Sequence, residues 1–212
     1  MNMPENLIFK QLEVGPMANY VYFIGDKKSN EIGVVDPAWD IDLIREEASK
    51  DGLIIKAILL THGHMDHTNG VDELSSKYDV PIYISGKEGF YSEIKNIVEI
   101  KDKENIRIGN IDIECILTPG HTPGSICFKY ENILISGDTL FIDGCGRCDL
   151  AGGSVEKMYD SLYNIISKMD DDTIIFAGHS YGPAPYATLA SQKQTNPYLT
   201  CKSKDEFINQ RM

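Results

Sequence analysis

The five histidines of this chain occupy positions typical of metal ligands. His62, His64 and His67 share one short segment, residues 61–67, which reads Thr-His-Gly-His-Met-Asp-His. His121 and His179 stand alone, and each directly follows a glycine. Histidine is the commonest metal-binding side chain in proteins. A chain that places all of its histidines in this way is expected to hold metal.

Two carboxylates extend the histidines to a set of seven side chains of ligand type. Asp66 lies inside the histidine cluster, and Asp138 follows a separate apolar run. Because the carboxylate of Asp138 has two oxygens, it can bridge two ions. We expect Asp66 to be a catalytic residue as well as a ligand. The expected metal ligands are His62, His64, Asp66, His67, His121, Asp138 and His179.

The spacing within the cluster predicts two ions side by side. His62 and His64 are two residues apart, so in an extended segment they point the same way. Asp66 and His67 are neighbours and suit the other ion. Of the two lone histidines, the earlier can complete the first site and the later the second. Two ions about 3.5–4 Å apart can stabilise both the attacking and the leaving oxygen of a hydrolysis, and zinc lowers the pKa of bound water to about 7.

Each group of ligands follows an apolar run that predicts a β-strand. The runs are residues 54–60, 111–117, 133–136 and 173–176. A rigid strand end can hold the loop residues that follow it in place. The sequence therefore predicts that four strands deliver the ligands from their C-terminal ends.

The remaining patterns predict an α/β fold with two sheets between layers of helices. A helix is expected between Asp40 and Gly52, and another opens at Ser154 with an apolar face that extends to Ile166. A short helix is expected over 71–78, and two more helices finish the chain. The other expected strands are residues 7–12, 20–24, 32–35, 81–84 and 125–130.

The composition is that of a soluble globular protein. The chain has 212 residues, of which 42% are hydrophobic and 25% charged, enough for one domain with a buried core. The net charge of −12 argues against nucleic acid and anionic membranes as partners, because phosphate binding depends on Lys and Arg. The chain shows neither a membrane-spanning run nor a signal peptide. Five scattered cysteines favour a reducing cytoplasm over a disulfide framework.

The histidine cluster resembles the His-x-His-x-Asp-His motif of the metallo-β-lactamase superfamily. His121, Asp138 and His179 match the later motifs of that superfamily in the same order, so the resemblance spans nearly the whole chain. It implies a four-layer αββα sandwich, formed by a single domain over residues 1–212 with a short C-terminal helical tail. Asp138 stands where β-lactamases of this fold often use cysteine, which argues against antibiotic hydrolysis.

Three further segments resemble the glyoxalase II branch, the hydroxyacylglutathione hydrolases. They are residues 118–125, 136–147 and 178–181. This resemblance implies that a metal-bound hydroxide hydrolyses a thioester of glutathione. Arg147 matches a basic residue that contacts the glycine carboxylate of glutathione, and a guanidinium can hold a carboxylate through two hydrogen bonds. Tyr181 matches a tyrosine near the same substrate.

Other segments depart from glyoxalase II. Cys148 and Asp149 stand where that family tends to have aromatic residues, and its longer glutathione-binding tail is missing. Residues 185–199 and 205–207 resemble instead the short tail of persulfide dioxygenases, which hold one iron through two histidines and one aspartate. Such a triad leaves positions open for Fe(II) to bind oxygen. The matching residues here are His62, His121 and Asp138.

These patterns together predict an enzyme that acts on a small thioester or thiol derived from glutathione. Thioester hydrolysis with two divalent ions (zinc, iron or manganese) is the first expectation. Oxidation of glutathione persulfide by a single Fe(II) is the alternative. A lactonase or another hydrolase of the superfamily comes next, and a non-enzymatic metal-binding module comes last. The sequence leaves the oligomeric state open.

Overall fold

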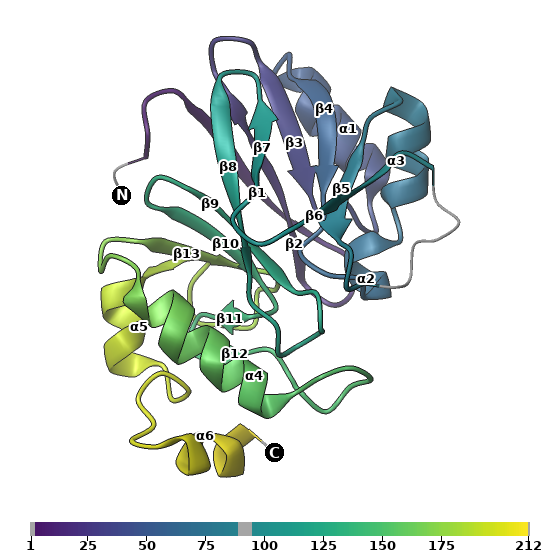
Figure 1. Ribbon diagram of the computed structural model, residues 1–212. Helices are drawn as coiled ribbons and strands as arrows, with labels where there is room; N and C mark the ends of the chain where they lie inside the picture. Colours follow the sequence, from purple (N-terminus) through teal and green to yellow (C-terminus); the bar gives the residue numbers. More distant parts are fainter. Residues whose placement is uncertain (1–2, 89–94, 212) are drawn as a thin grey trace.

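The computed structural model describes residues 3–88 and 95–211, and it contains two six-stranded sheets (Figure 1). The first sheet is built entirely from the N-terminal half of the chain. Its strands β3, β4 and β5 run parallel to one another. In spatial order the strands are β1 (Leu7–Val14), β2 (Asn19–Asp26), β3 (Glu31–Val35), β4 (Ile54–Leu59), β5 (Ile82–Ser85) and β6 (Ile97–Ile100).

The second sheet comes from the C-terminal half. Strands β10 and β13 are parallel, whereas β7, β8, β9 and β10 pair antiparallel in succession. The order is β14 (Ala187–Thr188), β13 (Ile174–Ala177), β10 (Ile133–Gly137), β9 (Ile126–Tyr130), β8 (Ile111–Leu117) and β7 (Asn105–Ile108). A small ribbon pairs β11 (Leu140–Phe141) with β12 (Gly144–Cys145).

Helices cover the outer faces of both sheets, as Figure 1 shows. None of the helices in the described part of the chain is long and apolar enough to cross a membrane. On the first sheet lie α1 (Ile41–Lys50), the short α2 (Met65–Thr68) and α3 (Val71–Tyr78). On the second lie α4 (Val155–Asp160) and α5 (Leu189–Thr195), and α6 (Lys204–Arg211) packs against α4.

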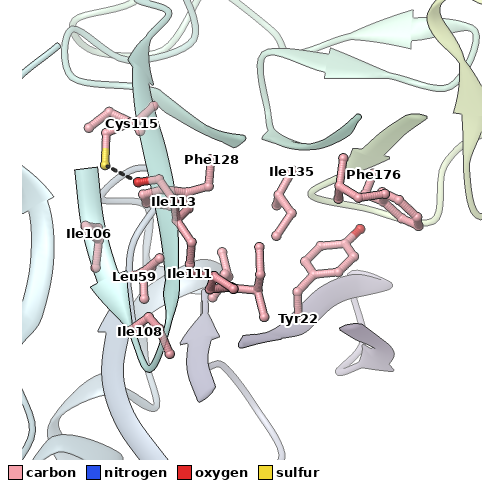
Figure 2. Close-up of a cluster of buried hydrophobic side chains, with 14 of the residues drawn as sticks. Tyr22, Leu59, Ile106, Ile108, Ile111, Ile113, Cys115, Phe128, Ile135 and Phe176 are labelled. Atoms are coloured by element: carbon pink, nitrogen blue, oxygen red, sulfur yellow. Dashed lines mark hydrogen bonds between the residues drawn. The ribbon is translucent and has the colours of Figure 1, made fainter. Parts of the chain in front are cut away.

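Three apolar layers hold these elements together, and β2 shows how one strand serves two of them. Because side chains alternate along a strand, Tyr20, Tyr22 and Ile24 point into the layer between the sheets, while Val21 and Phe23 pack in the layer with α1 and α3. Figure 2 shows the layer between the sheets, where side chains from both sheets meet. A third layer joins the second sheet to α4, α5 and α6. The expected αββα sandwich is therefore confirmed.

The small ribbon of β11 and β12 was not predicted from the sequence patterns. The structure also adds three unpredicted strands to the large sheets, β6, β7 and β14. Each is two to four residues long and lies at the edge of its sheet. An edge strand pairs on one side only and keeps solvent-facing polar residues, as the alternation of exposed and buried residues in β7 illustrates. Such short runs give only a weak apolar signal.

The helix expected to continue from Ser154 to Ile166 changes form partway. The regular helix α4 ends at Asp160, and it is followed by a π-helical turn (Ser161–Ile165) and a 3₁₀ turn (Ile166–Lys168). Its apolar face nevertheless stays on one side, since Met158, Leu162 and Ile166 are all fully buried.

Candidate metal centre

Four strand ends bring the expected ligands to one edge of the two sheets. In the second sheet β8, β10 and β13 all run in the same direction, because β9 pairs antiparallel with both β8 and β10, and β13 is parallel to β10. Their C-terminal ends precede His121, Asp138 and His179, respectively. In the first sheet β4 ends just before the histidine cluster. The predicted delivery of ligands from strand ends therefore matches the observed placement.

Two glycines allow the backbone to approach closely at this edge. Gly137 has a left-handed conformation (φ +49°), and a Cβ there would lie 2.6 Å from the side chain of Thr61. A Cβ on Gly178 would lie 2.3 Å from Oδ1 of Asp138. A side chain at either position would have to displace Thr61 or Asp138.

The first group of ligand atoms comes from His62, His64 and His121. Nδ1 of His64 lies 3.1 Å from Nε2 of His62 and 2.9 Å from Nε2 of His121. All three nitrogens lie within the spacing that one ion can span. This is the combination expected for the first ion.

The second group comes from Asp66, His67 and His179. The Nε2 atoms of His67 and His179 are 3.1 Å apart, and Oδ2 of Asp66 lies 3.5 and 3.4 Å from them, respectively. The carboxylate of Asp36 also lies close to His62 and His67. Its oxygens, however, accept hydrogen bonds from Thr61 and from Nδ1 of His67, so Asp36 orients a histidine and faces away from the centre.

Asp138 lies between the two groups. Its Oδ1 is 3.5 Å from Nε2 of His67, and its Oδ2 is 3.4 Å from Nε2 of both His121 and His179. All seven side chains predicted as ligands are therefore brought together, and the carboxylate expected to bridge has an oxygen facing each group.

Hydrogen bonds outside the cluster fix the orientation of four histidine rings. In each, Nδ1–H donates outward, which leaves the lone pair of Nε2 directed into the centre. The acceptors are Thr61 Oγ1 for His62 (3.0 Å), Asp36 Oδ2 for His67 (2.9 Å), the Arg147 carbonyl for His121 (2.7 Å) and the Met17 carbonyl for His179 (3.0 Å).

This arrangement fits bound cations. Lone pairs of neutral imidazoles held about 3 Å apart repel one another unless a positive charge lies between them. Within the described residues, Oδ1 of Asp138 is buried and accepts no hydrogen bond, and a buried carboxylate needs a partner of opposite charge. Histidine and carboxylate together suit zinc or iron.

The pKa shift of His67 shows that the neighbouring carboxylates favour positive charge at the centre. Burial favours neutral His67, but the carboxylates of Asp138 and Asp36 outweigh burial and raise its pKa to about 9. Burial likewise opposes ionisation of Asp138, yet His67 and His179 hold its pKa well below the usual range. Burial lowers the pKa of His62 well below its ordinary value, so this ring stays neutral.

Asn19 supports Asp66 and was not predicted from the sequence. Its Nδ2 donates to Oδ2 of Asp66 at 3.0 Å, while its Oδ1 accepts from the indole Nε1 of Trp39 at 2.8 Å. Trp39 therefore orients the amide beside it. Asn19 lies more than 40 residues before Asp66, so no local pattern connects the two.

Glu88 joins the two loops that carry the first group of ligands. Its Oε1 accepts hydrogen bonds from Thr122 Oγ1 (2.6 Å) and the Gly124 amide (2.8 Å), and its Oε2 accepts from the Gly63 amide at 3.1 Å. One carboxylate thus ties the loop of His62 and His64 to the loop of His121. The segment around Glu88 carries no motif that would have revealed this role.

A pocket of about 520 Å³ opens over the centre. Tyr181 and Arg147, the two residues predicted to bind substrate, both line it. The ring of Tyr181 is 58% exposed and stacks on His179, with centroids 4.5 Å apart. The guanidinium of Arg147 is paired with the carboxylate of Asp149.

Comparisons with known proteins agree with this geometry. A family model described as the metallo-beta-lactamase superfamily matches residues 14–179. The chain is 37% identical over 195 residues to PksB of Bacillus subtilis, a probable polyketide biosynthesis zinc-dependent hydrolase, covering 91% of this chain and 87% of that protein. It is 34% identical over 176 residues to a probable hydroxyacylglutathione hydrolase of Schizosaccharomyces pombe, covering 79% and 66%. The structure of ETHE1 from Myxococcus xanthus superposes with a TM-score of 0.89 at 28% identity, covering 95% and 88%.

Proposed function

This chain belongs to the metallo-β-lactamase superfamily, and we propose that within it the protein hydrolyses thioesters whose thiol part is glutathione or a similar thiol. One observation carries the proposal: seven ligand-type side chains form two groups that share Asp138 at the base of an open pocket. The likeness to a probable hydroxyacylglutathione hydrolase supports this substrate class, and the likeness to a zinc-dependent hydrolase supports zinc.

In this proposal each group of ligands would hold one divalent ion, and the carboxylate of Asp138, which lies beside both groups, would contribute to both sites. Two such ions, when bound, supply the positive charge that activates a water and polarises the thioester carbonyl. The first ion would be held by His62, His64 and His121. The second would be held by Asp66, His67 and His179.

Other side chains act on the substrate and on the water. The Asp66 carboxylate lines the pocket and is oriented by Asn19, so it can accept a hydrogen bond from the attacking water and direct it. Tyr181 offers its ring and hydroxyl to the substrate beside His179. Arg147 lines the same pocket, and it can meet an acidic group of the thiol part if that group displaces the carboxylate of Asp149.

Replacing the shared carboxylate tests this proposal. Asp138→Ala is expected to remove both metal content and S-lactoylglutathione hydrolysis, because the same side chain contacts both groups. Metal per chain is measured by elemental analysis, alongside the initial rate of hydrolysis. Asp112→Ala is the matched control, since Asp112 is exposed and forms an ion pair with Arg107 on the surface. Full activity and metal content in Asp138→Ala would rule out a shared two-ion centre.

A persulfide dioxygenase remains the second candidate, because the triad expected for it also meets. Nε2 of His121 lies 3.4 Å from Oδ2 of Asp138, and the rings of His62 and His121 have centroids 4.8 Å apart. Metal analysis of protein prepared with both zinc and iron separates the two functions. Two metals per chain with thioester turnover support the hydrolase. One iron, no thioester turnover and oxygen uptake with glutathione persulfide support the dioxygenase.

A further inference from the structure

We propose that Arg211, at the end of α6, is the residue that binds an anionic group of the substrate in this pocket. The inference rests on the proposed function, and it defines the substrate class further: a thioester whose thiol part carries a carboxylate. In this arrangement the thioester bond of the substrate lies at the metal centre. The carboxylate of its thiol part lies at the pocket wall formed by the C-terminal helix α6.

The placement of arginines is the first observation. The chain contains only four. Arg45 and Arg107 form ion pairs with acidic neighbours on other surfaces, whereas Arg147 and Arg211 both line the pocket over the metal centre. In a chain with a net charge of −12, a pocket with half of the arginines is suited to an anionic ligand.

Arg147 is already occupied by a carboxylate. Its Nε and Nη2 donate to the two oxygens of Asp149 at 2.7 and 2.6 Å. Two parallel hydrogen bonds of this kind are the geometry that an arginine uses to bind a substrate carboxylate. A ligand could use Arg147 in this way only after displacing Asp149.

Arg211 is held in place without such a pairing. Its Nε donates to the carbonyl of Gly146 at 2.9 Å, and its guanidinium lies 5.6 Å from the ring centroid of Tyr198. Arg211 makes no ion pair within the described residues. Its charge contributes to the lowered pKa of Asp149, but the carboxylate of Asp149 is paired with Arg147. The neighbouring Cys148 thiol has a pKa raised by burial to about 11, so it is neutral at physiological pH. A positioned cation with neutral contacts is suited to receive a carboxylate.

Gly146 also connects this cation to the metal centre. The carbonyl that accepts from Arg211 belongs to the residue before Arg147, whose own carbonyl accepts from Nδ1 of His121. Phe141 and Leu150 provide apolar wall to the same pocket. The pocket thus offers a reactive end, an apolar middle and a cationic end, matching an acyl thioester with an acidic thiol carrier.

Kinetics on charged and neutral thioesters test this inference. Arg211→Gln is expected to raise the KM for S-lactoylglutathione roughly 10- to 100-fold, the usual effect of losing a hydrogen bond to a charged group, with a much smaller change for the neutral lactoyl thioester of N-acetylcysteamine. Arg211→Lys keeps the charge without the forked geometry, so its KM for S-lactoylglutathione should lie between those of the parent protein and Arg211→Gln. Arg107→Gln is the matched control, because that arginine is exposed and lies in no pocket described above.

Two results would overturn the inference. Equal losses on both thioesters would mean that Arg211 only stabilises the position of α6. A KM increase in Arg147→Gln with none in Arg211→Gln would assign the carboxylate to Arg147. Circular dichroism of each variant shows whether it is folded, and Arg211→Lys, which retains packing and charge, gives a result if Arg211→Gln is unfolded.

Binding of the unreactive thioether S-methylglutathione separates this inference from the proposed hydrolysis. Calorimetry on the metal-loaded protein should show binding that is weakened by Arg211→Gln. That result without any thioester turnover would support the anionic subsite and reject the hydrolase. Turnover with unchanged binding in Arg211→Gln would support the hydrolase and reject the subsite.

Discussion

Trp39 determines which way the amide of Asn19 faces. An indole N–H can only donate, so the atom of Asn19 that meets it must be the carbonyl oxygen. The NH₂ group is thereby turned toward Asp66, whose Oδ2 accepts its hydrogen bond. The residue types of the centre could be predicted because histidine and aspartate have few other uses at such spacing. Asn19, Trp39 and Glu88 could not, because their roles arise only when distant segments meet.

Trp39→Phe tests this contact, because it removes the indole donor and keeps an aromatic ring. Without that donor the Asn19 amide can rotate and place its oxygen against the Asp66 carboxylate, which repels it. We expect affinity for the second ion to fall about tenfold, the lower range for loss of an outer partner of a metal ligand. Competition with a chelator measures this. Asn19→Ala should show an equal or larger loss; a loss only in Asn19→Ala would mean that Trp39 does not orient the amide.

One fully buried side chain anchors the helix α6. Phe207 is its only fully buried residue, and it packs among Tyr159, Tyr163 and Tyr198 with ring centroids 5.5 to 6.3 Å away. The sequence predicted a final helix at this place. It could not predict the partner of the helix, because the tyrosines come from a distant helix and a loop. At the level of elements, the apolar central strands were predicted well and the short edge strands were missed.

Phe207→Ala should therefore destabilise the protein strongly. Removing a large, fully buried aromatic side chain is expected to lower the free energy of unfolding by about 3–5 kcal/mol. Urea unfolding followed by circular dichroism measures the change. Asn209→Ala, an exposed position on the same helix, should stay within about 0.5 kcal/mol of the parent protein. A comparably small effect for Phe207→Ala would show that α6 is held by other contacts.

On the scale of the whole molecule, the candidate metal centre lies where the two sheets meet. The segment 61–67 follows a strand of the first sheet, whereas His121, Asp138 and His179 follow strands of the second. Direct backbone bonds also cross here, such as that from the Tyr20 amide to the Gly178 carbonyl at 2.8 Å. Ions held by both halves of the sandwich must therefore favour the packed arrangement of the sheets over their separation.

Removal of metal should lower thermal stability. A ligand that binds only the folded state at a free concentration 1,000 times its Kd stabilises that state by about 4 kcal/mol. We expect the unfolding midpoint to fall after dialysis against a chelator and to recover when zinc is added back. Asp138→Ala should respond far less to either treatment. An unchanged midpoint in the parent protein would mean that the sheets pack independently of the ions.

The two large sheets are also separate along the chain, because β1 to β6 build one, whereas β7 to β10 build the other together with β13 and β14. The chain crosses between them once, over residues 101–104. A break at that crossing would give two fragments, each with a complete sheet and neither with a complete ligand set. Catalysis would then require the fragments to reassociate. The molecule is thus suited to complementation, in which recovered activity reports that two separately expressed halves have come together.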